Sequence, residues 1–187
     1  MHTYISMLRG INVSGQNIIK MTELKMLYES LHLINVTTYI QSGNVVFQSR
    51  SNDPLSISTS IEKAIVKSFG FPVTVVLRRP AEFRKVINRF PLLGTPNIDE
   101  GKLYVTFLKS RPTPALVKAI ALVPAKTSDV YEIGGSEIYV YCANGYGKTL
   151  FSNSYFEKRL GVVATTRNWK TVRTLLAMSS ESKTGRS

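Results

Sequence analysis

Apolar and polar residues alternate along the first half of the chain in a pattern that predicts four strands and two helices. Met21, Leu24, Leu27 and Leu31 recur at three- and four-residue intervals, as they would on the buried face of a helix. The predicted strands cover residues 3–8, 36–41, 45–49 and 73–77, and the predicted helices cover 20–33 and 54–69. Strand, helix, two strands, helix and strand is the element order of a ferredoxin-like unit.

The same order of elements is predicted a second time after residue 101. A helix over 80–90 and a Gly- and Pro-containing stretch over 90–101 separate the two series. The second series has strands at 103–108, 129–133, 137–142 and 162–166, a helix from Thr113-Pro114 to Pro124, a helix from a capping box at Ser154 and Glu157 to Gly161, and a last helix at 169–178. The expected fold class is α+β, with two ferredoxin-like subdomains at 1–90 and 102–187, a linker at 91–101 and a short polar tail.

Composition narrows the class of protein. The 187 residues include 24 Lys and Arg against 12 Asp and Glu, a net charge of +12, and 43% are hydrophobic, which is enough to bury a core. The single cysteine, Cys142, excludes an internal disulfide, and with only two histidines it cannot form a common Cys/His zinc site. No apolar run reaches membrane-spanning length, and the start lacks the features of a secretory signal. We therefore expect a cytoplasmic protein with no membrane partner, no metal and no cofactor that the sequence requires.

Two loops are expected to meet at one edge of the first sheet. In a ferredoxin-like sheet, strand 1 ends where strand 2 connects to strand 3, so the polar loop 9–17 should lie beside the turn 41–44. The first helix begins at the same edge, and the free N–H groups of a helix start favour an anion. The candidate ligand-binding residues at this edge are Arg9, Gly10, Asn12, Gly15, Lys20, Gln41, Ser42 and Asn44. Their alternative role is structural, because Gly and Asn are common in turns that bind nothing.

A second polar edge is expected in the second half of the chain. The strand that ends at Cys142 leads into the loop 143–149, which should lie near the start of the last helix at 167–169. The letters GYGKT suggest a phosphate loop, but the Walker A pattern needs glycine where Cys142 stands, so that assignment is rejected. Lys148, Arg167 and Asn168 are the candidate ligand residues here, and the alternative is a glycine turn with solvated basic residues. We expect the Arg167 guanidinium to be partly buried and bonded to carbonyls, a carboxylate or an anion.

These features favour a protein that binds a small anionic or nucleotide-like ligand at its loop ends. A basic nucleic-acid-binding module is the alternative, and a structural or interaction protein is a third hypothesis. Residues 101–187 carry 13 basic and 5 acidic side chains, and Arg167, Lys170 and Arg173 should form a basic stripe on the last helix. Tyr139 and Tyr141 share a strand face, where RNA-binding ferredoxin-like sheets stack bases.

Catalytic patterns are scarce in the sequence. The G-x-S-x-G nucleophile pattern is absent. Cys142 has no histidine near it in the sequence, and at a strand end it is best interpreted as a small buried apolar residue. Whether the protein is an enzyme is therefore left open, and no catalytic residue is assigned.

Four segments of the chain resemble an uncharacterised bacterial family whose members open with LLRGINVGG and close with TRNWNTV. The segments are MLRGINVSGQN from Met7, KMTEL from Lys20, TYIQSGNVVFQS from Thr38 and TTRNWKTV from Thr165. The resemblance spans nearly the whole chain and implies an α+β protein of two ferredoxin-like subdomains, with no established activity, cofactor or catalytic residue. The chain departs from the family pattern at Ser14, Gln16 and Lys170. Gln16 stands where lysine is frequent, which weakens an anion-binding role for the first loop.

Overall fold

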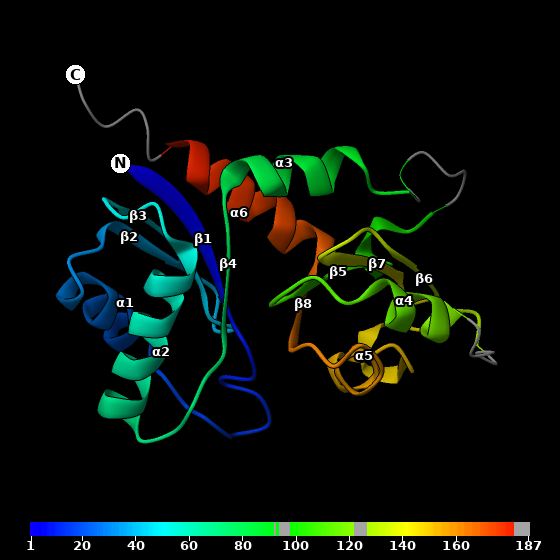
Figure 1. The fold of residues 1–187 in the computed structure, drawn as a ribbon, viewed down its shortest axis with the longest axis horizontal. Coiled ribbons are helices and arrows are strands. Elements are labelled where there is room, and N and C mark those ends of the chain that lie inside the picture. The colour runs from blue at the N-terminus through cyan, green and yellow to red at the C-terminus, as the bar shows by residue number, and fades with distance from the viewer. Residues whose placement is uncertain (92, 94–97, 122–126, 182–187) are drawn as a thin grey trace. The chain divides into compact units, whose positions relative to one another are not determined.

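The computed structural model describes residues 1–91, 93, 98–121 and 127–181. These residues form a mixed α+β fold with two four-stranded antiparallel sheets, each built from its own half of the chain (Figure 1). Contacts divide the chain into two compact units: residues 1–85 with the chain from 174 onward, and residues 86–173. The expected linker at 91–101 stays a prediction, because residues 92 and 94–97 lie outside the described part, as do Pro124 and the tail at 182–187.

The first unit contains a sheet with the strand order β2-β3-β1-β4. Its elements are β1 (His2–Leu8), α1 (Met21–Ser30), β2 (Ile34–Tyr39), β3 (Asn44–Ser49), α2 (Pro54–Phe69) and β4 (Val75–Arg78). The predicted elements are all present, with ends that differ by a few residues. α2 begins and ends as its sequence indicates: the Asp53 carboxylate accepts a hydrogen bond from the Leu55 N–H, and Gly70 ends the helix at a φ of 82°.

The core of the first unit lies between the sheet and two helices, α1 and α2, which cover the same face (Figure 1). Its fully buried side chains include Tyr4, Leu8 and Phe47 from the sheet, Leu24 and Tyr28 from α1, and Ile61 and Ile65 from α2. Tyr28 is buried with its hydroxyl 2.7 Å from the Ser6 Oγ, so the polar end of this core ring is hydrogen-bonded.

The second unit contains a sheet with the strand order β6-β7-β5-β8. Its elements are β5 (Leu103–Leu108), α4 (Pro114–Ala121), β6 (Val130–Ile133), β7 (Glu137–Tyr141), α5 (Asn153–Leu160) and β8 (Ala164–Asn168), with 3₁₀ turns at Glu100–Lys102 and Tyr146–Lys148. Its core packs sheet residues such as Leu108, Ile138 and Val140 against Ile120, Phe156 and Leu160 of the helices. The boundaries between the two units lie inside α3 (Pro80–Asn88) and α6 (Trp169–Glu181), the helices that follow each sheet.

The predicted capping box at Ser154 and Glu157 is wrong. Ser152 is the N-cap of α5, and its Oγ accepts a hydrogen bond from the Tyr155 N–H at 3.3 Å. The Glu157 carboxylate instead accepts a hydrogen bond from the Ala164 N–H at 2.9 Å, at the start of edge strand β8. A glutamate can either close a capping box or accept a hydrogen bond from the N–H of a neighbouring strand, and the sequence does not distinguish these two roles. Here the path of the chain after Gly161 brings the Ala164 N–H within reach of Glu157.

The same pattern of hydrogen bonds occurs within each of the two units, which the order of the elements alone did not reveal. At the end of the first strand of each sheet, the backbone N–H of Leu8 donates to the Gly43 carbonyl and that of Leu108 to the Ser136 carbonyl. The next residues, Arg9 and Lys109, donate to the carbonyls of Thr74 and Val163, and all four bonds are 2.8–2.9 Å long. At the edge strands, Glu62 accepts from the Val75 N–H and Arg78 donates to the Leu77 carbonyl, while Glu157 accepts from Ala164 and Arg167 donates to the Thr166 carbonyl, again at 2.8–2.9 Å. The repetition of these bonds is residue-level support for a repeated unit.

Candidate functional site

A short hairpin follows β1 and forms the most exposed part of the first unit's loop edge. The Gln16 N–H donates to the Val13 carbonyl at 2.9 Å, and the Asn12 N–H donates to the Asn17 carbonyl at 3.2 Å. Ser14 and Gly15, the two residues at its tip, both have positive φ, 51° and 74°, as a type I′ turn requires. We call residues 12–17 the finger; positions 13–18 are all exposed.

The Asn12 side chain fastens the finger to its surroundings. Its amide nitrogen donates to the Gln41 carbonyl at 2.8 Å and to the Ile19 carbonyl at 2.9 Å, and its Oδ1 accepts from the Ile19 N–H at 2.9 Å. The expectation that loop 9–17 lies beside turn 41–44 is therefore confirmed. The Asn12 amide is used inside the chain, however, so its role here is structural.

The turn between β2 and β3 is held in a similar way. Asn44 is fully buried, and its amide nitrogen donates to the Tyr39 carbonyl at 3.1 Å and to the Ser42 Oγ at 3.0 Å. Gly43 has a φ of 73°, and a Cβ built on it would lie 2.7 Å from the Ile11 Cδ1. The Asn and Gly residues of this turn therefore serve the packing of the edge, as the structural alternative expected.

Two basic residues remain as charged candidates at this edge. Arg9 is half-buried directly after β1, and its N–H donates to the Thr74 carbonyl at 2.9 Å. Lys20 stands at the N-cap of α1, with 77% of its side chain exposed and its Nζ 3.9 Å from a Glu23 carboxylate oxygen. Because lysine has no acceptor, the first turn of α1 has no side-chain cap, whereas α2 and α5 are capped by Asp53 and Ser152. We call Arg9, the finger, Ile18, Lys20 and residues 40–43 the finger edge.

The second expected edge is organised by a carboxylate that sequence analysis missed. Asp129 is buried, and its two oxygens accept from the Ala143 N–H at 2.8 Å and from the Thr149 hydroxyl at 2.6 Å. These bonds hold both ends of the loop 143–149, in which Lys148 is exposed. A buried carboxylate beneath this loop opposes an anion there, so this loop is a poorer anion site than the finger edge. The only sequence signal was an Asp just before a strand, a common turn residue.

The start of α6 lies near this loop, as expected. The ring of Tyr146 packs on Tyr104 with centroids 4.9 Å apart, and Tyr104 pairs with Asn168 across the sheet. The Asn168 Oδ1 accepts from the Thr171 N–H at 2.8 Å, which makes it the N-cap of α6. Asn168 is thus engaged within the chain.

Arg167 is buried, and the expectation about its guanidinium is confirmed. Its Nη1 donates to the Thr165 Oγ1 at 2.8 Å and to the Thr166 carbonyl at 2.9 Å, acceptors on its own strand. Burial lowers the pKa of Arg167 to about 10. The predicted basic stripe on the last helix is wrong, because Arg167 belongs to β8 and Arg173 lies 3.4 Å from the Glu100 carboxylate.

Two tyrosines of the second sheet, Tyr139 and Tyr131, pack against other aromatic rings, while Tyr141 is half-buried. Tyr139 is buried with its ring 5.0 Å from that of Phe90, and the Tyr131 ring packs against Phe151 at 4.7 Å. Base stacking needs an accessible ring face. This geometry counts against nucleic acid binding through these strands.

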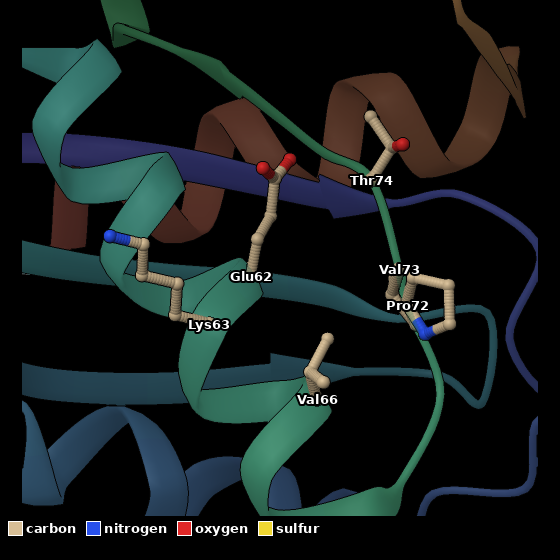
Figure 2. Close-up of a pocket in the computed structure, with 6 residues that line it drawn as sticks. All are labelled: Glu62, Lys63, Val66, Pro72, Val73 and Thr74. Atoms are coloured by element: carbon tan, nitrogen blue, oxygen red, sulfur yellow. The ribbon is translucent and has the colours of Figure 1, made fainter.

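A cavity of about 350 Å³ lies between α2 and the segment that leads into β4 (Figure 2). It is lined by Glu62, Lys63, Val66, Pro72, Val73 and Thr74. Glu62 extends toward the chain near Thr74 and caps the Val75 N–H, whereas Lys63 extends away from it (Figure 2). The polar lining groups therefore do not converge on a ligand position.

Cys142 should be unreactive in the folded protein. Its side chain is fully buried, and burial raises the pKa of its thiol to about 11 despite a hydrogen bond with Thr149 that acts in the opposite direction. Since the thiolate is the reactive form, we expect negligible labelling by a disulfide reagent near neutral pH and full labelling in guanidinium chloride. Rapid labelling of the native protein would contradict this account of the site.

Metal and membrane signals are absent from the part of the chain that is described. Within residues 1–91, 93, 98–121 and 127–181, no group of three or more His, Cys, Asp or Glu residues could hold a metal ion. Over the same ranges, no helix is long and apolar enough to cross a bilayer.

The two antiparallel sheets and their helices define the protein as a member of the mixed α+β class. The chain belongs to the DUF1697 family, described as a protein of unknown function, whose sequence profile matches residues 1–139. Among solved structures it is similar to a conserved bacterial protein from Streptococcus pneumoniae, with a TM-score of 0.74 and 24% sequence identity, covering 95% of this chain and 98% of that one. No curated protein matches the chain. These comparisons show the family and the fold, and its function is unknown.

Proposed function

We propose that the protein is a cytoplasmic binding protein whose finger edge takes the anionic group of a ligand, such as the phosphate of a small nucleotide-like molecule. Arg9 and Lys20 supply positive charge, and the first turn of α1 supplies N–H groups that no side chain caps. Gln41 and Ser42 add neutral polar groups, and Gly10 and Gly15 allow close backbone approach. Asn12 and Asn44 hold the edge together, and Lys148, Arg167 and Asn168 are left out of the site.

The observation that carries the proposal is the concentration of unusual backbone at this edge. Six non-glycine residues of the described chain have positive φ, and four of them, Asn12, Ser14, Asn17 and Ile40, lie in the finger or beside the turn to which it is tied. Such conformations are unfavourable for L-residues, and they tend to cluster where a binding surface has to be shaped. Ser14 has a positive φ because a type I′ turn requires it, and Asn tolerates this region, so Ile40 is the least expected of the four.

Each sheet with its two covering helices is further proposed to be a ferredoxin-like subdomain. The bounds predicted from the sequence are 1–90 and 102–187 with a linker at 91–101, whereas the contacts group residues 86–90 with the second sheet and residues from 174 onward with the first. The strand orders β2-β3-β1-β4 and β6-β7-β5-β8 support this assignment. Scaffolds of this kind host many activities, so the fold adds nothing to the ligand proposal.

The test is phosphate binding to the whole protein. Titration calorimetry with inorganic phosphate, pyrophosphate and a panel of nucleotides and sugar phosphates should detect binding that Arg9→Gln and Lys20→Gln each weaken roughly tenfold, because each removes a charge-assisted contact. Arg173→Gln is the matched control, since it removes the same charge from a side chain that is 62% exposed elsewhere. Equal weakening by all three variants would mean that only net charge matters, and would contradict a specific site.

Salt dependence separates this function from nucleic acid binding. Binding to many phosphates of a nucleic acid falls steeply with salt, whereas one phosphate group gives a shallow slope. A steep slope with an oligonucleotide, unchanged by Arg9→Gln, would favour the alternative function instead.

A further inference from the structure

Three exposed β-branched residues are gathered at the finger edge. Val13 and Ile18 are each 58% exposed, and Ile40 is 49% exposed. The Asn12 side-chain amide donates hydrogen bonds to the carbonyls of Ile19 and Gln41. Val13 follows Asn12 in the chain, Ile18 precedes Ile19, and Ile40 precedes Gln41. Scattered exposed apolar residues are ordinary, but these three are each one residue away from a group in the same set of hydrogen bonds, so their backbone positions are close.

Ile40 is also held in an unfavourable conformation. Its φ is 49°, in the left-handed region that β-branched residues avoid most strongly. Asn or Gly would occupy this position with less strain. Because Ile40 is 49% exposed, packing within the unit recovers little of that unfavourable energy. An apolar side chain kept outward at such a position is best explained by a contact with another molecule.

The charged residues around these side chains are mostly basic, with one carboxylate among them: a Glu23 oxygen lies 3.9 Å from the Lys20 Nζ. No Asp or Glu occurs at residues 1–22 or 30–52, the two segments that supply the finger edge, whereas both Arg9 and Lys20 lie there. A surface that combines exposed aliphatic side chains with positive charge complements a partner that carries an apolar side chain beside carboxylates.

We propose that the finger edge docks an acidic segment of another protein, with an aliphatic or aromatic side chain of that segment packed on Val13, Ile18 and Ile40. This inference rests on the proposed function, since it names carboxylates of a protein as the source of the anion. The exposure of residues 13–18 favours a protein over a small molecule, whose sites are usually concave and enclose the ligand. Val and Ile offer no planar face for base stacking, which disfavours a single-stranded nucleic acid.

The test is selection of a random peptide library displayed on phage against the immobilised full chain. Enriched peptides should be acidic and carry one large apolar residue. By fluorescence anisotropy, the synthetic peptides should bind Ile40→Asn at least tenfold more weakly than wild type, while the melting temperature of Ile40→Asn is unchanged or raised because Asn accepts a left-handed φ. Ile18→Ser should weaken binding as well. Leu55→Asn is the control, since Leu55 is 69% exposed on α2 and should not affect binding.

Three results would overturn the inference: no enrichment over an uncoated surface, enriched peptides without acidic residues, or equal affinity for wild type and Ile40→Asn. The proposed function is tested separately by phosphate. If phosphate binding depends on Arg9 and Lys20 but no Ile40-dependent peptide is found, the anion site stands and the protein partner is refuted. If nucleotides bind in an Ile40-dependent way and peptides do not, the apolar contact belongs to a small ligand.

Discussion

Gly43→Ala is expected to lower the free energy of unfolding by roughly 2–5 kcal/mol, the sum of a left-handed backbone penalty and overpacking. Gly43 has a φ of 73°, and its added Cβ would lie 2.7 Å from the Ile11 Cδ1 and 2.9 Å from the Leu8 Cβ. Both neighbours are buried, so neither can move without disturbing the core. Urea unfolding followed by circular dichroism measures the change.

Gly15→Ala is the matched control for this prediction. Gly15 has nearly the same φ, 74°, but no atom lies within 4 Å of its added Cβ. Only the backbone penalty of about 1–2 kcal/mol should therefore remain. Equal losses in the two variants would show that the contact of Gly43 with Ile11 and Leu8 contributes nothing.

Asp129→Ala is expected to destabilise the second unit by roughly 2–4 kcal/mol, because it removes two hydrogen bonds to a buried carboxylate and leaves a backbone N–H without its acceptor. The bonds run from the Ala143 N–H and the Thr149 hydroxyl, so the loop 143–149 should also loosen. The second readout is Cys142, which should become reactive to a disulfide reagent before global unfolding.

Asp99→Ala provides the comparison for Asp129. The Asp99 carboxylate also accepts a backbone hydrogen bond, from the Gly101 N–H at 2.9 Å, but its side chain is 57% exposed. Water can replace that bond, so a loss of about 1 kcal/mol or less is expected. A loss as large as that of Asp129→Ala would refute burial as the reason for the difference.

At the finger edge, the sequence predicted where the loops lie but not which partners their polar side chains bind. Their juxtaposition followed from strand order, and the bond between Asn12 and Gln41 confirms it. Which polar groups remain for a ligand could not be deduced in this way. An Asn side chain has the same chemistry whether it binds a ligand or a carbonyl of its own chain, and here Asn12 and Asn44 bind carbonyls.

Local signals in the sequence were enough to place the helices and strands, because apolar periodicity, Asp53 before Pro54 and glycines at helix ends act over a few residues. Tertiary structure alone decided the roles of Glu157 and Asp129, whose partners lie 7 to 20 residues away. It also decided which groups accept hydrogen bonds from the Arg167 guanidinium, the Thr165 hydroxyl and the Thr166 carbonyl, and that Ile40 is exposed at a left-handed φ. The physical reason is that burial and hydrogen-bond partners depend on which segments the fold brings together. The type of a residue does not by itself specify which residues will lie next to it in the fold.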